Sequence, residues 1–546
     1  MTSPAIRRWD PETALVAAFA ACVSVASFLF YLRHGGLLLY GDAVAHINIA
    51  RRVFDSRTPG LLQLGTVWLP LPHLLMLPFL LSDSMWKSGV GGSIPSLAAY
   101  VAGVAGIFRL VRSALSFRSE PDATVRTAAW IAAIVYGANP NLIYLQTTAM
   151  TEPLYLALFI WAVVYFSQFV ERAGGHDLQP SSSLTKCGLC LFAACLTRYD
   201  GWFLAIAMCV TGALIALPER SRGRLRRGLG RFVLLAVTAP ALWLAYNAII
   251  YRNPLEFANG PYSARAIEQK ASQAGIAPHP GAKDLRAAAS YFLKSAELNL
   301  AEGNWQELWL ALVLAGVVMT LLFDRRLWPL LLLLLPLPFY MLSVAYGGVP
   351  IYLPVWWPFS YYNVRYGLEL LPAFAVFGAL TGYFASCWVR SPAGRTAVAA
   401  AIVIAIAGSY VSVWRARPIS FREASINSRT RMALESELAA TLKKLPPRST
   451  LLMYLGDHPG ALQQAGIPLR RVIQEGNHRT WKQPSDPEGE WERALANPAE
   501  HADFVITVEG DPVAAAMLSH SLLPIADIHV NAQPAATIYQ THPPAR

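Results

Sequence analysis

One short polar segment, directly after the first long apolar run, combines a carboxylate with an imidazole: Tyr40-Gly-Asp42-Ala-Val-Ala-His46. A carboxylate at the edge of a membrane can act as a general base on a hydroxyl or an amine. His46 follows Asp42 by one helical turn, so the two side chains can share one helix face. The alternative role for Asp42 is structural, because aspartate often caps the start of a helix.

Two further polar turns lie beside apolar runs and hold charged side chains. In Thr151-Glu152-Pro153, the glutamate opens an apolar run. Its carboxylate is either favoured there by the dipole of the helix N-terminus or is a second acid of the same site. In Arg198-Tyr199-Asp200, the two charges form either a local ion pair or a place where a cation meets a phosphate.

The fourth segment begins another apolar run and reads Tyr361-Tyr362-Asn363-Val364-Arg365-Tyr366, with Glu369 one helical turn after Arg365. An acid inside a membrane is costly unless it is paired. The sequence therefore predicts that Arg365 pairs with Glu369 on the same helix face. Arginine at this depth also suits the phosphate of a lipid. We expect the four segments to converge on one side of the membrane.

The elements that carry these segments are predicted to be membrane-spanning helices. Hydrophobic residues make up 54% of the chain and charged residues only 14%, whereas charged residues are about a quarter of a typical soluble domain. A span needs roughly 17–25 apolar residues, and the apolar runs predict about eleven spans. They are expected at 12–33, 92–111, 127–146, 153–170, 185–199, 201–218, 232–250, 306–323, 327–345, 364–387 and 396–413.

The basic residues between these runs predict the orientation of the chain, because cytoplasmic loops of membrane proteins carry an excess of Lys and Arg. With the N-terminus in the cytoplasm, the basic connections fall on that side: Arg7, Arg8, Arg109, Arg112, Arg118, Arg126, Arg222, Arg224, Arg226, Arg227, Arg231, Arg325, Arg326, Arg390 and Arg395. The other side receives the outer segments 34–91, 251–305 and 346–363 and the chain after Trp414. To keep this alternation, the short, proline-containing segment Trp68–Leu81 is predicted to be an interfacial helix.

The composition becomes that of a soluble protein near the C-terminus. The sequence thus predicts a transmembrane domain over 1–414 and an extracytoplasmic α/β domain over 415–546. A helix over Ser420–Leu445 is expected to lead away from the membrane, and Asp511 is expected to cap a later helix. Strands are expected at Thr450–Tyr454, Leu469–Ile473 and Asp503–Val508.

Charge and cysteine content exclude other classes of protein. The formal net charge of +11 is explained by cytoplasmic loops, because the basic residues lie between apolar runs and form no surface for reading nucleic acid. All six cysteines lie inside apolar segments, so neither a disulfide framework nor a zinc site is predicted. No cofactor is expected; a divalent metal stays open but is not indicated.

These segments resemble motifs of the GT-C glycosyltransferases that use polyprenyl-phosphate sugars, the clan of protein O-mannosyltransferases and lipid A aminoarabinose transferases. Gly41-Asp42 with Ala50-Arg51 is similar to the acidic first outer loop of the clan. Thr66–Pro72 resembles its proline-containing interfacial helix, and Thr151–Pro153 its acidic turn. Arg365-Tyr366 with Leu371-Pro372 resembles its late arginine motif. Many members have two adjacent acids in the first loop, whereas this chain has Asp42-Ala43.

The resemblance implies a membrane glycosyltransferase that moves a sugar from a polyprenyl-phosphate donor to a glycan, lipid or protein. It implies that Asp42 is the general base, with His46 as its neighbouring partner, and that Glu152 positions the acceptor or orients the base. It also implies that Arg365, with Arg198 as a second candidate, stabilises the leaving lipid phosphate. The expected substrate-binding residues are His46, Arg51, Arg198, Asp200, Tyr362, Arg365 and Tyr366. The expected location is the plasma membrane, with the site facing the periplasm or the cell exterior and the segment Tyr251–Trp305 able to close over it.

Two other functions stay open at this point. A multispan transporter or flippase of a lipid-linked sugar would place polar residues near the midpoints of its spans, whereas the acids here cluster at outer ends. An oligosaccharide polymerase or ligase would take its glycan from a lipid pyrophosphate and would need a divalent metal or several more cations.

Overall fold

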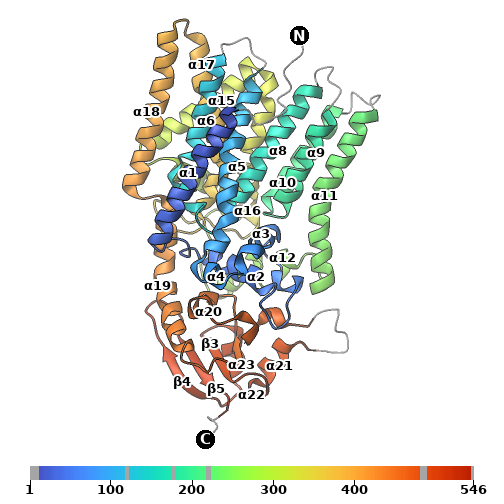
Figure 1. Cartoon of the computed structure of the whole chain (residues 1–546), viewed down its shortest axis with the longest axis vertical. Coiled ribbons are helices and arrows are strands. Elements are labelled where there is room, and N and C mark those ends of the chain that lie inside the picture. Colours follow the sequence, from blue (N-terminus) through green and yellow to red (C-terminus); the bar gives the residue numbers. More distant parts are fainter. Residues whose placement is uncertain (1–10, 117–121, 174–179, 217–222, 480–487, 543–546) are drawn as a thin grey trace.

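The computed structural model describes residues 11–116, 122–173, 180–216, 223–479 and 488–542, and within them the chain forms two parts. A bundle of long helices makes up most of the molecule, and a small domain with a β-sheet lies at one end of it (Figure 1). The N-terminus lies at the opposite end of the bundle from the C-terminus. This arrangement agrees with the predicted fold class, a polytopic helical protein with a small C-terminal α/β domain.

The long helices of the bundle coincide with the apolar runs of the sequence. Helices that are apolar along most of their length must be covered by other helices or by lipid, because water cannot solvate them favourably. They are α1 (Pro11–Arg33), α5 (Val90–Leu115), α6 (Asp122–Gly137), α8 (Glu152–Ala173), α9 (Pro180–Cys195), α10 (Asp200–Ala216), α11 (Gly223–Tyr251), α15 (Trp305–Phe323), η2 (Arg325–Leu334) with α16 (Pro336–Tyr346), α17 (Leu371–Trp388) and α18 (Pro392–Ala416).

The expected number of spans is not confirmed. Among the residues that the structure describes, eight helical segments are long and apolar enough to cross a membrane. The predicted spans 185–199 and 201–218 fall on the shorter helices α9 and α10. The predicted span 127–146 is interrupted, because α6 ends at Gly137 and a separate helix α7 (Pro140–Leu145) begins at a proline, which cannot continue the preceding helix.

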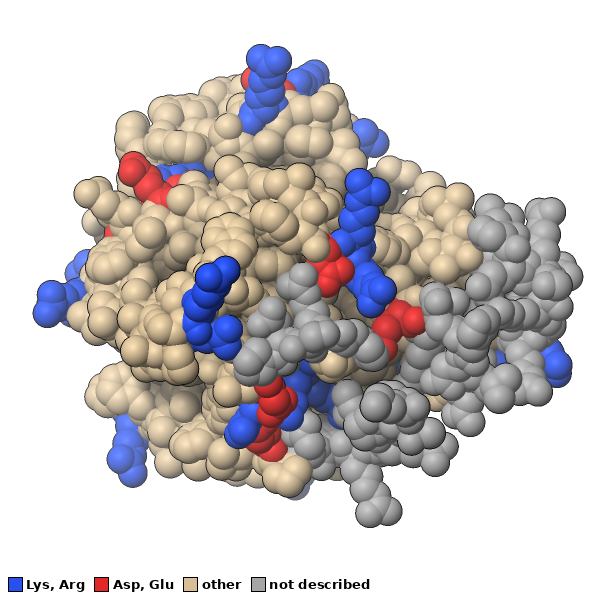
Figure 2. Space-filling view, turned by 90° about the horizontal axis from the view of Figure 1, so that it is seen from above, with Lys and Arg blue, Asp and Glu red and all other residues tan. Residues whose placement is uncertain are grey.

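The end of the bundle near the N-terminus carries the connections that the sequence analysis assigned to the cytoplasm. Glu12 at the start of α1 accepts hydrogen bonds from Arg112 of α5 and Arg126 of α6, which brings these three helix ends together. Figure 2 views this end and shows Lys and Arg side chains spread over it, with some acidic side chains between them. Arg7, Arg8, Arg118 and Arg222 lie outside the described residues.

Short helices lie between the opposite end of the bundle and the sheet domain (Figure 1). The segment predicted as interfacial, Trp68–Leu81, contains α3 (Leu71–Leu80), a helix of 10 residues that is too short to span a membrane. The remaining short helices of the outer segments are α2 (Gly41–Arg52), η1 (Leu61–Leu64), α4 (Asp83–Ser88), α12 (Glu256–Asn259), α13 (Ala264–Gln273) and α14 (Leu285–Leu300). The 3-10 helix η3 (Val364–Leu370) forms the start of the predicted span 364–387, directly before α17.

The C-terminal domain has a five-stranded sheet of order β2-β1-β3-β5-β4. Its first three strands in the chain lie parallel, whereas β5 is antiparallel to both β3 and β4. The strands are β1 (Leu451–Met453), β2 (Val472–Ile473), β3 (Phe504–Val508), β4 (Leu523–Ile528) and β5 (Ala536–Gln540). Helices α20 (Pro459–Ala465), α21 (Glu490–Ala496), α22 (Pro498–His501) and α23 (Pro512–Met517) complete the domain, with the short turns η4 (Leu469–Arg471) and η5 (Glu475–Asn477).

The strands of the parallel half and the capped helix agree with the sequence analysis. Asp511 caps α23 by accepting a hydrogen bond from Ala514 N at 2.5 Å, and β1, β2 and β3 lie within the predicted segments. Strands β4 and β5 were not predicted. In β4 most side chains are exposed, and Pro524 lies inside the strand. The sequence therefore shows no buried apolar run at this position, and the proline, which has no backbone N–H to donate to a neighbouring strand, argues against a strand.

The helix α19 (Ile419–Leu442) joins the bundle to the sheet domain, and the domain also docks on the first outer segment. Asn48 of α2 donates a hydrogen bond to Gln463 of α20 at 2.9 Å. Arg52 of α2 contacts Glu475 at 2.8 Å and Gln474 at 2.9 Å. Buried hydrogen bonds to a charged group hold a fixed geometry better than an exposed ion pair, so these contacts fix α2 between the two parts.

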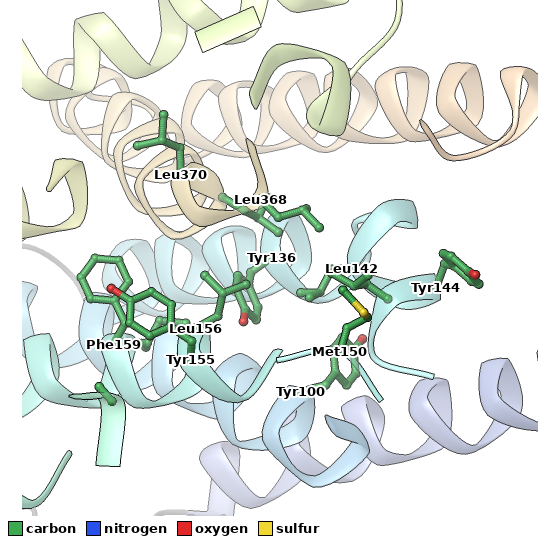
Figure 3. Close-up of a cluster of buried hydrophobic side chains, with 14 of the residues drawn as sticks. Tyr100, Tyr136, Leu142, Tyr144, Met150, Tyr155, Leu156, Phe159, Leu368 and Leu370 are labelled. Atoms are coloured by element: carbon green, nitrogen blue, oxygen red, sulfur yellow. The ribbon is translucent and has the colours of Figure 1, made fainter. Parts of the chain in front are cut away.

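The core of the bundle lies where α5, α6, α7, α8 and η3 meet. Figure 3 shows large side chains from these elements and from the turn before α8 gathered in one cluster: Tyr100, Tyr136, Leu142, Tyr144, Met150, Tyr155, Leu156, Phe159, Leu368 and Leu370. The hydroxyl of a buried tyrosine usually makes a hydrogen bond. In this cluster, the hydroxyl of Tyr144 donates to the backbone carbonyl of Gly36 at 3.1 Å. This packing fixes the starts of α8 and η3, which carry Glu152 and Arg365.

Candidate functional site

Three side chains from distant parts of the sequence meet at the end of the bundle next to the sheet domain. Arg365 on η3 donates through Nη2 to Asp42 Oδ2 of α2 at 2.5 Å and through Nε to Glu152 Oε1 of α8 at 3.1 Å. Hydrogen bonds between guanidinium and carboxylate groups are short and strong because both partners are charged. The predicted convergence of Asp42, Glu152 and Arg365 is therefore present in the structure.

Asp42 does not serve as the cap of α2. The N-cap of that helix is Tyr40, which makes no side-chain cap hydrogen bond, and Asp42 lies in the first turn. Its carboxylate is engaged by Arg365 instead. This observation distinguishes the two roles considered for the residue and favours its membership of a charged site.

A third carboxylate on Arg365 comes from an element that the sequence analysis did not connect with the site. Glu423 on α19 accepts through Oε1 from Arg365 Nη1 at 2.9 Å and from the backbone N of Asn363 at 3.1 Å. Asn363 has a φ of 56°, in the left-handed region, and it immediately precedes η3. Glu423 thus holds both the arginine and the start of the turn that carries it.

The predicted ion pair between Arg365 and Glu369 is wrong. Glu369 contacts a different arginine, Arg198, with 3.6 Å between its Oε1 and the Nε of the guanidinium. The reason is the local geometry, because η3 is a 3-10 helix with about three residues per turn. A residue four positions later then points about a third of a turn away, and Arg365 and Glu369 face different neighbours.

Arg198 is the centre of a second group of contacts beside the first. Its Nε donates to Asp200 Oδ2 at 3.1 Å, its Nη1 to the hydroxyl of Thr151 at 3.2 Å, and its Nη2 to the hydroxyl of Tyr340 at 2.7 Å. Nη1 also lies 3.4 Å from Glu152 Oε1. Glu152 therefore bridges Arg198 and Arg365, so the turn at Arg198 and Asp200 belongs to the same buried network.

Two aromatic rings complete the surroundings of the guanidinium groups. Tyr366 lies against both arginines, with its ring centre 5.1 Å from the guanidinium carbon of Arg365 and 5.2 Å from that of Arg198. The ring of Tyr40 lies 5.0 Å from Arg365. Faces of aromatic rings attract cations, so these rings help to hold both arginines where water is excluded.

Exposure distinguishes Asp42 from the other acids of the network. Its side chain is 44% exposed, whereas those of Glu152, Glu369 and Glu423 are at most 2% exposed. Asp42 is therefore the carboxylate that an incoming molecule can reach, and Arg365 Nη2 lies directly behind it.

The network holds more carboxylates than its arginines can neutralise. Asp42, Glu152, Asp200, Glu369 and Glu423 surround Arg198 and Arg365. Several buried carboxylate oxygens of the network make no hydrogen bond: Glu152 Oε2, Asp200 Oδ1, Glu369 Oε1 and Oε2, and Glu423 Oε2. In the part of the chain that the structure describes, no group of three or more His, Cys, Asp or Glu side chains is arranged to hold a metal ion.

His46 lies next to the network but does not contact Asp42. The Nδ1 of its ring shares a hydrogen bond of 2.9 Å with Nε2 of His73 on α3, and its ring lies 4.6 Å from that of Trp68. Burial, together with the positive charges of Arg365 and Arg198, lowers the pKa of His46 to about 3. A histidine that stays neutral over the physiological range positions its neighbours and does not exchange protons with Asp42.

Two predicted substrate-binding residues are not brought into the network. The guanidinium of Arg51 is occupied by Asp55 at 2.9 Å, Asp83 at 2.6 Å and the carbonyl of Leu80 at 2.6 Å. It therefore joins α2 to the end of α3 and to the start of α4. Tyr362 lies three residues before Arg365 with an exposed side chain, and its backbone pairs with that of Tyr352.

Glu423 and Tyr340 are the members of the network that the sequence analysis did not assign to it. A weak signal for Glu423 is present, because it follows Ile419 by four residues and would share a helix face with that apolar residue if the predicted helix began one residue earlier, as α19 does. Ile419 and Glu423 are both buried. For Tyr340 no such signal exists, since a tyrosine in an apolar run is ordinary.

Comparison with known proteins relates this geometry to a fold. Neither a protein-family model nor a curated protein sequence matches the chain. The crystal structure of ArnT from Cupriavidus metallidurans bound to undecaprenyl phosphate is similar, with a TM-score of 0.56, 13% identity and coverage of 97% of this chain and 98% of that one. Its apo state gives a TM-score of 0.55, 12% identity and coverage of 96% and 97%.

A further similar structure is that of the oligosaccharyltransferase of Archaeoglobus fulgidus, with a TM-score of 0.48, 14% identity and coverage of 93% of this chain and 70% of that one. At such low identities, the likeness to ArnT shows the fold alone, since one fold can host several functions. The chain has the GT-C fold that the sequence resemblance predicted.

Proposed function

We propose that the protein is a membrane glycosyltransferase that moves a sugar from a polyprenyl-phosphate donor to an acceptor outside the cytoplasm. The observation that carries the proposal is the half-exposed Asp42 carboxylate in contact with the buried Arg365, in a chain with the GT-C fold. The exposed acid can serve as a base, and the buried arginine beside it can bind an anion. A reaction that takes up a proton and releases a phosphate needs both.

The phosphate of the donor would bind at Arg365. The Nη2 of this arginine faces Asp42, whereas Nε and Nη1 are held by the buried Glu152 and Glu423. A phosphate oxygen that reaches Nη2 would take the place of Asp42 and would leave that carboxylate free. Arg198 is a poorer candidate for the phosphate, because each of its three nitrogens already contacts a buried partner.

The released Asp42 would act as the general base. It would accept the proton of an acceptor hydroxyl or amine while the acceptor oxygen or nitrogen bonds to the anomeric carbon of the sugar. The bond between that carbon and the phosphate oxygen would break, and its electron pair would leave on the polyprenyl phosphate. Arg365 would stabilise the charge that grows on the phosphate, and Glu152 would keep Arg365 oriented.

The site would face the periplasm or the cell exterior of a plasma membrane. It lies at the end of the bundle next to the C-terminal domain, opposite the end with Arg112, Arg126 and the other basic connections (Figure 1). Basic connections favour the cytoplasmic side. An isoprenoid chain would remain in the bilayer while its sugar reaches Asp42, and the acceptor would be a glycan, a lipid or a protein on that side.

A transfer assay tests the proposal. Purified full-length protein is incubated with a panel of polyprenyl-phosphate sugars together with glycan, lipid and protein acceptors, with and without a chelator, and the released polyprenyl phosphate is measured. We expect release with at least one donor and no effect of the chelator. We expect Asp42→Asn to lower the rate at least about a hundredfold, since a general base usually contributes that much or more.

Asp83→Asn is the matched control for this substitution. Asp83 is also an exposed acid of the first outer segment and also pairs with a buried arginine, Arg51, at 2.6 Å. We expect this variant to keep a rate within about threefold of wild type, because removing an exposed ion pair costs little. Equal rates for wild type and Asp42→Asn would eliminate Asp42 as the base. Absence of release from the whole panel would contradict the proposed donor class.

A further inference from the structure

Glu423 occupies a position that joins the proposed site to the C-terminal domain. It lies in the first turns of α19, the helix that leads from the bundle into that domain, and it is 1% exposed. Its Oε1 accepts two hydrogen bonds, from Arg365 Nη1 at 2.9 Å and from Asn363 N at 3.1 Å, whereas its Oε2 has no hydrogen-bond partner. A buried carboxylate with one unsatisfied oxygen is costly, which calls for a reason beyond packing.

The helix that carries Glu423 is fixed on both sides of it. Before Glu423, the backbone N of Ser420 donates to Asn141 Oδ1 at 2.9 Å. After it, Arg431 donates through Nη2 to the carbonyls of Leu38 and Leu39, both at 3.0 Å, a few residues ahead of Asp42. The carboxylate of Glu423 is therefore held rigidly relative to both Asp42 and Arg365.

The charges around Arg365 suggest what this carboxylate does. One positive charge faces three carboxylates, those of Asp42, Glu152 and Glu423. Each of them lowers the attraction that Arg365 exerts on any other anion, because like charges a few ångströms apart repel. Since Glu152 and Glu423 are buried and Asp42 is exposed, only the last can be replaced by an incoming anion.

The geometry points to Glu423 as a positioning residue that holds Arg365 and limits its affinity for anions, so that Asp42 and the phosphate of a lipid can exchange on it. This inference rests on the proposed function and extends it to the release of the product. The donor is a phosphodiester with one negative charge, whereas the product polyprenyl phosphate is a monoester whose second ionisation lies near pH 6. Glu423 repels the more highly charged product more strongly than the donor, and it thereby favours product release.

The variant Glu423→Gln isolates the charge. The amide oxygen can still accept from Arg365 and Asn363, and the amide nitrogen takes the place of the oxygen that has no partner. We expect the inhibition constant of undecaprenyl phosphate to fall on the order of tenfold. The substitution removes one negative charge near the bound phosphate, and this is the size of effect expected for such a charge at a partly screened site. We expect kcat to fall, because the more highly charged product stays bound at Arg365, whereas the KM for the donor does not rise.

Two further variants separate charge from structure. Glu423→Asp keeps the charge but shortens the side chain, so it should keep the inhibition constant of wild type better than Glu423→Gln does. A merely structural role would give the reverse order, because glutamine preserves the shape and aspartate does not. Glu435→Gln is the matched control, since Glu435 is also buried on α19, pairs with Arg431 at 2.7 Å and has one oxygen without a partner.

An unchanged inhibition constant in Glu423→Gln, or an equal shift in Glu435→Gln, would overturn the inference. Thermal unfolding of the full-length variants, followed by tryptophan fluorescence, identifies any variant that fails to fold. If wild type transfers no sugar from any donor, the proposed function fails. The role of Glu423 is then decided by direct binding of undecaprenyl phosphate, with tighter binding to Glu423→Gln than to wild type supporting it and equal binding refuting it.

Discussion

While Asp42 is paired with Arg365, its Oδ2 is occupied by the hydrogen bond from the guanidinium and is not available to a proton of the acceptor. The distance of 2.5 Å between Arg365 Nη2 and Asp42 Oδ2 means that this pair must open before Asp42 can accept a proton from an acceptor. A donor phosphate that competes for Nη2 would open it. At the scale of single residues, the same contact therefore keeps the base inactive until the donor has bound.

His46 offers a test of the burial of this region through its pKa of about 3. A histidine whose folded pKa lies below its unfolded value of about 6.5 stabilises the protein fully above pH 6.5 and loses that contribution as the pH falls toward 3. We expect wild type to lose more thermal stability between pH 7 and pH 5 than His46→Asn, which cannot titrate at this position. Unfolding temperatures in detergent at several pH values measure the difference.

His34→Asn serves as the control for this series, because His34 is an exposed histidine at the end of α1. Its dependence of unfolding temperature on pH should parallel that of wild type. Parallel curves for wild type and His46→Asn would show instead that His46 is not kept neutral by burial.

At the scale of elements, η3 determines the orientation of Arg365, and the close contact between η3 and α14 fixes the position of η3. A Cβ atom on Gly367 would lie 2.3 Å from the carbonyl carbon of Ser295 and 2.4 Å from the backbone N of Ala296. Only glycine allows two backbones to approach this closely. The side chains of α14 also reach the turn, since Asn299 donates to the carbonyl of Val364 at 2.6 Å.

Gly367→Ala should therefore displace η3 and with it Arg365. Because rigid backbone, and no flexible side chain, blocks the added methyl group, we expect a destabilisation of roughly 1–3 kcal/mol and a loss of undecaprenyl phosphate binding. Gly230→Ala on α11 is the control, since nothing lies within 4 Å of a Cβ there. Unfolding temperature and lipid binding are measured for both, and an unaffected Gly367→Ala would mean that η3 can shift freely.

The elements of the bundle were largely predictable, and the details of the site were less so. Apolar runs and their prolines mark α1, α3 and α17 in the sequence because hydrophobic length is a local property. The predicted pairing of Arg365 with Glu369 assumed the spacing of an α-helix, whereas η3 is a 3-10 helix. That geometry depends on the packing of η3 against α14 and is not visible in the local sequence. Glu423 could not be assigned to Arg365 because nothing local tells which distant helix crosses the site.

At the scale of the whole molecule, the C-terminal domain is part of the environment of the site. It is joined through α19, which carries Glu423, and it docks through Gln463 and Glu475 on α2, which carries Asp42. The sequence predicted the existence of the domain and the parallel strands β1, β2 and β3. Its docking surface was not predictable, because contacts such as Arg52 with Glu475 join polar residues more than 400 positions apart.

The most direct test of this account is a structure of the full-length protein with bound undecaprenyl phosphate, determined by electron cryomicroscopy in a lipid nanodisc. The account predicts that a phosphate oxygen lies within hydrogen-bond distance of Arg365 Nη2 and that the Asp42 carboxylate has moved off the guanidinium. It is contradicted if the phosphate binds elsewhere, for instance beside Arg112 and Arg126 at the other end of the bundle, while the pair of Asp42 and Arg365 stays closed.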